Sequence, residues 1–227
     1  YTGSPITPCT ATVTGANLNT TVPIVYGNNT NVGTATADAS YPGGPNHSAS
    51  TATQVTFQIT PGPTVTTITS DNPDASIYGG TITVNFTVVA PGGGTPSGAF
   101  TITLQGGTDT CSGVFTGGAG SCAMTLTKVG PGTIILVYSG DANFIGSSDT
   151  EDHQVDKAVL NVNAIANSKV YGDADPALAA SLSGFVIAGE DATNIGLTGS
   201  ASCTRTEGET VAGSPYPITC TPGTLAS

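Results

Sequence analysis

Few side chains in this sequence could do chemistry, and its two histidines are the first to consider. His47 lies in a turn rich in glycine and proline, and His153 lies in a strand or linker near residue 156. Neither adjoins a serine or cysteine motif, although Ser–His–Asp sites assemble from residues far apart in a chain. There is no Gly-x-Ser-x-Gly motif, and Pro91-Gly-Gly-Gly94 lacks the lysine of a phosphate-binding loop. We therefore predict no enzymatic activity and no cofactor.

An acidic run near residue 156 offers a second kind of chemistry. Calcium binds carboxylate and carbonyl oxygens, so Asp149, Glu151 and Asp152 are candidate ligands at a junction between two modules, with Asp156 close by. The order of these residues does not match an EF-hand. The alternative is a solvated acidic strand edge.

The five cysteines form two close pairs and one remaining residue. Cys111 and Cys122 flank a glycine-rich turn, as expected for a disulfide across a hairpin, and Cys203 and Cys220 flank a second turn-rich stretch. No pair has metal-site spacing. Two disulfides predict an oxidising, extracellular location. Cys9 is either a free buried thiol or the partner of a cysteine outside this chain.

Attached sugar is a further expectation, because the sequence is rich in threonine and poor in charge. Asn-x-Ser/Thr sequons begin at Asn19, Asn28, Asn46 and Asn85, which makes these the candidate N-glycosylation sites. O-glycosylation of threonine and serine is an alternative. The third interpretation is an unmodified secreted β-surface rich in threonine and asparagine.

Composition favours an all-β protein and excludes several functions. The 227 residues include 31 glycines and 15 prolines, and only 8% are charged, with a net charge of -11. Threonine and valine favour strands, while glycine and proline mark turns. Four basic residues cannot form a nucleic-acid-binding stripe. The longest apolar runs are far below the roughly 18–20 residues that span a bilayer, so we predict no membrane insertion.

One turn sequence occurs twice. Tyr138–Ser147 and Tyr41–Ser50 both follow the pattern Tyr-x-Gly-x-x-Asn-x-x-x-Ser. Asp141 of one copy is replaced by Gly44 in the other, so the two copies share no charge chemistry. We interpret the motif as a corner between strands and as the joint of a modular array.

Turn signals and strand patterns divide the chain into three modules, over 1–60, 64–156 and 157–227. In the first, alternation predicts that one face of a strand is buried, formed by Val55, Phe57 and Ile59. The second contains seven short strands, which predicts a Greek-key sandwich. These strands are expected at Val65–Ser70, Gly80–Ala90, Gly98–Gln105, Cys111–Phe115, Ser121–Thr127, Gly132–Tyr138 and Glu151–Val155.

The central module resembles a bacterial Ig-like repeat domain of the kind found in tandem along large surface adhesins. The resemblance rests on Ser76-Ile-Tyr-Gly-Gly80, on Thr95-Pro-Ser-Gly98 before a Phe100-Thr-Ile-Thr strand, on the Cys111…Cys122 hairpin and on the Tyr138 ending. The module lacks the tryptophan of antibody domains. Its disulfide is expected within a hairpin and not between sheets.

The third module resembles the MBG-type repeat of bacterial surface and mucin-binding proteins, through Lys169-Val-Tyr-Gly-Asp-Ala-Asp-Pro176 and the segments after it. Gly3–Cys9 echoes Gly213–Cys220, so we interpret 1–60 as a partial MBG- or Ig-like module. The first module is expected to lack its first strand and the third its last. Either the chain is a piece of a longer repetitive protein, with Tyr1 a processed or cut end, or subunits complete one another by strand addition.

These features predict a structural subunit or repeat segment of an extracellular bacterial filament or surface fibre. Its partners would be copies of itself, joined head to tail, or the continuation of the same chain. The alternative is an adhesin module that binds host or matrix glycans or mucin. Against that alternative, the tyrosines at motif positions are expected to fill cores and corners and not to stack on sugars; these are Tyr41, Tyr78, Tyr138 and Tyr171.

Overall fold

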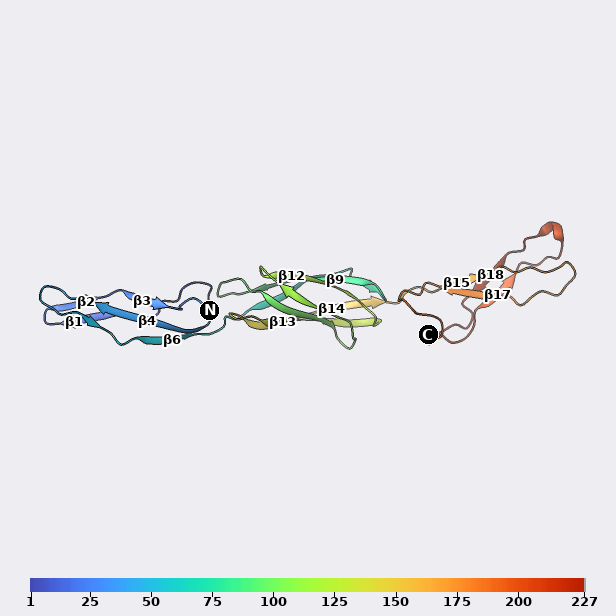
Figure 1. Ribbon diagram of the computed structural model, residues 1–227. Helices are drawn as coiled ribbons and strands as arrows, with labels where there is room; N and C mark the ends of the chain where they lie inside the picture. The colour runs from blue at the N-terminus through green and yellow to red at the C-terminus, as the bar shows by residue number, and fades with distance from the viewer. Residues whose placement is uncertain (227) are drawn as a thin grey trace. The chain divides into compact units, whose positions relative to one another are not determined.

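The computed structural model describes residues 1–226, and almost all of its regular structure is β-strand (Figure 1). The chain forms two compact units. The first consists of Tyr1–Ser76, Thr81–Thr127 and Pro131–Gln154, and the second of Ile77–Gly80, Lys128–Gly130 and the chain from Val155 onward. Within residues 1–226, no helix is long and apolar enough to cross a membrane. The all-β prediction is confirmed.

The N-terminal part of the first unit is a thin sheet built around β4. Its strands are β1 (Thr12–Gly15), β2 (Leu18–Thr21), β3 (Ile24–Gly27), β4 (Gly33–Tyr41), β5 (Ser50–Thr51) and β6 (Val55–Ile59). Strand β4 pairs antiparallel with β3, with β6 and with the short β5, while β1 and β2 form a separate hairpin.

The core of this part is small. Its buried apolar side chains are Ala35, Ala37 and Ile59. Burial rises along β6 from Val55, which is 51% exposed, through a half-buried Phe57 to Ile59 at 4%. The predicted alternation is right, but the expectation that Val55 faces the core is wrong, because the core ends before the strand does.

The central part of the chain is a two-layer sandwich. Its strands are β7 (Val65–Asn72), β8 (Ser76–Ile77), β9 (Thr81–Val89), β10 (Gly98–Leu104), β11 (Thr110–Phe115), β12 (Ala119–Thr125), β13 (Gly130–Gly140) and β14 (Ile145–Asp156). One sheet has the order β12-β9-β7 and the other β11-β10-β13-β14-β8. The chain changes sheet on either side of β8, between β9 and β10, and on either side of β12. The two sheets contain the seven predicted strands and the two-residue β8 in addition.

Aromatic and branched side chains from both sheets fill the space between them. On β9, Ile82, Val84, Phe86 and Val88 alternate with threonine and asparagine and are at most 1% exposed. The ring centroid of Phe86 lies 4.7 Å from the ring centroid of Phe100 in the facing sheet. Burying each such side chain stabilises the fold by about 1.5–3 kcal/mol, so this core dominates the stability of the sandwich.

The Cys111–Cys122 disulfide is formed as predicted, but its place in the fold differs. Cys111 lies on β11 and Cys122 on β12, which belong to different sheets. The two strands are consecutive, and a single bridge between Thr116 and Ala119 closes the turn between them before they diverge. The disulfide therefore crosses the turn between consecutive strands, as expected, but the expectation that it does not lie between sheets is wrong, because the bond joins the two layers.

The C-terminal part has short strands and long loops. Strand β15 (Asn161–Ala164) pairs with β16 (Ala180–Ser183), and β17 (Ser202–Arg205) pairs with β18 (Ile218–Thr221), both antiparallel. A single 3₁₀ turn, η1, spans Val211–Gly213. After Val155, no residue up to 226 is fully buried, so this part lacks the dry core of the sandwich.

Candidate functional sites

The turn at Tyr138–Ser147 is held by its own side chains. The Tyr138 hydroxyl donates to the carbonyl of Ser97 at 2.8 Å. One carboxylate oxygen of Asp141 accepts the backbone N–H groups of Asn143, at 2.8 Å, and Phe144, at 3.0 Å. Burial, together with the Asp141 carboxylate, raises the pKa of Tyr138 to about 12. Asp141 therefore acts as a turn former.

The same turn fixes the linker that enters the sandwich. The N–H of Gly62 donates to the carbonyl of Asn143 and the N–H of Ile145 donates to the carbonyl of Gly62, both at 2.9 Å. The side-chain oxygen of Asn143 accepts the N–H of Val32 at 3.2 Å. The Tyr1 ring stands edge-on to Phe144 with centroids 5.1 Å apart. Within the first unit this turn is thus a joint, in which the linker is paired like a strand.

The repeated sequence at Tyr41–Ser50 forms the same turn. Gly43 and Gly140 occupy equivalent positions with φ of +89° and +86°, a region that residues with a Cβ rarely adopt. The N–H of Gly44 donates to the carbonyl of His47 at 2.9 Å. In the same way, the backbone N–H of Asp141 donates to the carbonyl of Phe144 at 3.1 Å. Unlike Asn143, Asn46 is exposed. The motif was therefore correctly interpreted as a corner between strands.

A buried polar cluster surrounds His153 in the sandwich. Its Nδ1 lies 2.7 Å from Oδ2 of Asp71 and 3.5 Å from Oδ1 of Asp74, and its Nε2 lies 2.9 Å from Oγ of Ser76. A carboxylate only accepts, so Nδ1 donates its proton to Asp71. This is the connectivity of a Ser–His–Asp triad, but Ser76 is 1% exposed and its hydroxyl cannot reach a substrate.

The sequence did not reveal this cluster, because its members lie far apart in the chain. Asp71 is the last residue but one of β7, and His153 follows it by 82 positions on β14. Both strands had been predicted, but their relative position in the fold had not. The one available signal was the two-residue period of β14, which places His153 on an inward face.

The three predicted calcium ligands are not brought together. Strand β14 directs Asp149 and Glu151 to one face and Asp152 to the other. Asp149 accepts the N–H of Ile68 at 2.8 Å, and Asp152 accepts the hydroxyl of Thr133 at 3.3 Å. Burial is the largest cause of a raised pKa at Glu151, and the charges of neighbouring aspartates raise it further. The arrangement is that of two strand faces and not of one coordination shell.

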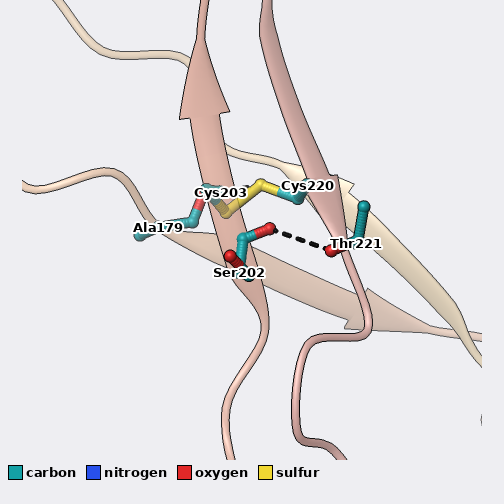
Figure 2. The surroundings of a disulfide bond; sticks show 5 residues. All are labelled: Ala179, Ser202, Cys203, Cys220 and Thr221. Atoms are coloured by element: carbon teal, nitrogen blue, oxygen red, sulfur yellow. Dashed lines mark hydrogen bonds between the residues drawn. A yellow bond between two sulfur atoms is a disulfide. The ribbon is translucent and has the colours of Figure 1, made fainter.

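The second disulfide fastens the C-terminal part. Cys203 on β17 lies directly opposite Cys220 on β18, with 4.1 Å between their Cα atoms (Figure 2). Figure 2 also shows Ala179 beside the bond and the Thr221 hydroxyl directed at the carbonyl of Ser202. This pairing is as predicted. Cys9 is half-buried and free, and its backbone N–H donates to the Tyr26 hydroxyl at 2.9 Å.

The four sequon asparagines differ in accessibility. Asn19, Asn28 and Asn46 are exposed. Asn85 is half-buried on β9 and its amide donates to the Ser70 hydroxyl at 2.9 Å. Glycosylation stays a prediction, and the exposed sites are the better acceptors.

Four charged side chains form a closed network in the C-terminal part that the sequence did not predict. Lys169 and Arg205 each pair with both Asp175 and Glu209, at 2.7–2.8 Å. These bonds raise the pKa of Lys169 and of Arg205, and lower the pKa of Asp175 and of Glu209. The guanidinium also lies 5.4 Å from the ring centre of Tyr216.

Tyr171 corrects another expectation. Tyr138 is buried and Tyr41 and Tyr78 are half-buried, as expected of residues that fill corners, but Tyr171 is 70% exposed. It borders a hollow of about 280 Å³ that is also lined by Asp175 and Arg205. The turn that carries Tyr171 has no core beneath it, and so its ring stays in solvent.

Comparison with known families found a similarity for the C-terminal part. Residues 160–226 match the model of the MBG domain (YGX type), a stretch that includes Tyr171-Gly172-Asp173 and all four C-terminal strands. No curated protein matches the chain. The match confirms the resemblance of this part of the chain to MBG-type repeats.

Proposed function

We propose that this chain is a structural segment of an extracellular bacterial filament or surface fibre. The MBG match indicates a module of a repetitive surface protein. The observation that carries the more specific proposal is the joint, where Gly62 is hydrogen-bonded on both sides into the Asn143–Ile145 turn. A linker paired in this way resists bending better than a free one, which suits a load-bearing array. Two disulfides support an oxidising location outside the cell.

The first copy of the turn supports head-to-tail addition. Asn143 is engaged by the preceding part of the chain, whereas the equivalent Asn46 is exposed. A module placed before the first could pair its linker with Asn46 and Ser48, as the linker at Gly62 pairs with Asn143 and Ile145. The partner is then a copy of this chain or its continuation.

The C-terminal part supports completion by an added strand. It contains an apolar hollow of about 970 Å³, within the second unit, whose lining includes Leu160, Val162, Phe185, Ile195, Leu197 and Leu225. A β-strand with alternating apolar residues would cover these half-exposed side chains and hydrogen-bond to an edge.

Electron microscopy combined with light scattering tests the proposal. Purified chain incubated at high concentration should form regular fibres whose repeat is one chain, and Asn46→Ala should slow fibre growth relative to Asn19→Ala. A monodisperse monomer at every concentration would rule out assembly from separate subunits. Native surface material without fibres of this repeat would rule out the structural role altogether.

An adhesin that binds glycans is the second proposal. It is favoured by the exposed Tyr171 beside a hollow with charged hydrogen-bonding groups, an arrangement that suits a sugar ring. A glycan array on which wild-type chain binds, and Tyr171→Ala does not, would support it. Enzymatic activity is not proposed, because the serine–histidine pair that resembles a catalytic site in residues 1–226, Ser76 with His153, is buried.

A further inference from the structure

The cluster around His153 has the composition and spacing of a metal site. Nδ1 of His153, Oδ2 of Asp71 and Oδ1 of Asp74 all lie within 4.8 Å of one another. Donors bound to a zinc ion at about 2.0–2.2 Å with tetrahedral angles are about 3.3 Å apart. His153 Nδ1 lies 3.5 Å from Oδ1 of Asp74, close to this value. It lies 2.7 Å from Oδ2 of Asp71, so this distance would have to increase by about half an ångström to admit an ion.

The second nitrogen of His153 is already oriented as in metal-bound histidines. Its Nε2 lies 2.9 Å from the Ser76 hydroxyl, and both side chains are buried. A histidine that binds a metal through one nitrogen commonly donates the other N–H to such an outer partner, which fixes the ring. With an ion at Nδ1, the Nε2–H would donate to Ser76 and the hydroxyl proton would turn away.

Charge also favours a cation here. Carboxylate oxygens of Asp71 and Asp74 lie 2.7 and 3.5 Å from the same nitrogen of His153. Two carboxylates directed at one imidazole nitrogen bring together negative charge that a divalent ion would neutralise. The Asp74 side chain is 50% exposed, so an ion can enter from solvent without unfolding the sandwich.

We propose that Asp71, Asp74 and His153 bind one first-row divalent transition-metal ion, of which Zn²⁺ is the best fit. An imidazole nitrogen with two carboxylates suits such ions, while Ca²⁺ takes six to eight oxygen ligands. The ion would tie the end of β7 and the loop after it to β14. This site is separate from the three carboxylates considered for calcium and independent of the proposed fibre.

Calorimetric titration of the full chain tests the site. The protein should carry no histidine tag and have Cys9→Ser to remove the free thiol, and it should be stripped with a chelator before Zn²⁺ is added. One ion per chain and a higher melting temperature are expected. Co²⁺ should give visible absorption bands of a four- or five-coordinate site, and Ca²⁺ should not displace it.

The matched variants are Asp74→Asn and Asp152→Asn, because both residues are exposed and only Asp74 belongs to the cluster. Asp74→Asn should weaken Zn²⁺ binding by at least about tenfold with the circular dichroism unchanged, and Asp152→Asn should leave the affinity as it was. Equal affinity in both variants would show diffuse binding to acidic groups and overturn the proposal. No heat and no melting shift in the parent chain would overturn it too, leaving a hydrogen-bonded structural cluster.

Discussion

The sandwich and the C-terminal part of this chain are both small β-structures, but they are stabilised by different means. The sandwich buries a continuous apolar core that includes Phe86 and Tyr138, and its disulfide adds to that core. The C-terminal part has no fully buried residue between 156 and 226, and its restraints are the Cys203–Cys220 bond and four paired charges. The two parts should therefore fail under different conditions.

The largest expected effect is on the core. Phe86→Ala should cost the sandwich about 3–5 kcal/mol, because it removes a ring that contacts two others between the sheets. Phe185→Ala, the same change at a half-buried position of the C-terminal part, should cost much less. Hydrogen exchange read by mass spectrometry gives the free energy of opening for each part. Equal losses would show that the C-terminal part has a core after all.

Removal of a disulfide should destabilise the C-terminal part more than the sandwich, the reverse of the order expected for the core substitutions. Cys203→Ser with Cys220→Ser should destabilise the C-terminal part by about 3 kcal/mol, since the bond closes a loop with a sequence separation of 17 and only the short ladder of β17 with β18 also joins its ends. Cys111→Ser with Cys122→Ser should leave the sandwich folded at room temperature. Exchange and circular dichroism after reduction measure both. A sandwich that unfolds first would contradict the comparison.

The joint should show an effect of intermediate size. Asn143→Ala removes the acceptor for the N–H of Val32, at a cost of about 1 kcal/mol, and should speed hydrogen exchange at the linker more than inside the sandwich. Asn46→Ala, at the equivalent exposed position of the first copy, is the control. It should change neither the stability nor the hydrogen exchange at the linker. If both variants behave alike, the turn at Tyr138–Ser147 has no special role in holding the linker.

The sequence predicted what local pattern determines. The sequence was enough to predict the alternation along β9 and β6, the turns at Gly43 and Gly140, and both cysteine pairs, because each of these depends on residues close in the chain. Features that depend on contacts between distant strands could not be predicted. The cluster of Asp71 with His153 forms only when the two sheets pack together. The Cys111–Cys122 bond joins the two layers because β11 and β12 diverge into different sheets. Tyr171 is exposed because no core lies beneath it.

The smallest expected effect is on the charged network, and its direction follows from the pKa shifts. The pKa values of Asp175 and Glu209 are lowered, so their contribution is present above the ordinary carboxyl range and is lost as the pH falls through their folded values. The pKa of Lys169 is raised, so its contribution is lost only as the pH rises through its folded value. The C-terminal part should therefore open more readily below about pH 4.

Salt should weaken the same network, because ion pairs in contact with solvent are screened by dissolved ions. Raising the ionic strength from 0.01 to 1 M should lower the protection of residues near Arg205 while that of β9 stays constant. Arg205→Lys keeps the charge but loses the two parallel bonds from Nε and Nη2 to the two carboxylate oxygens of Asp175, so it should lose part of this salt dependence. A C-terminal part equally stable at both ionic strengths would leave the disulfide as its main restraint.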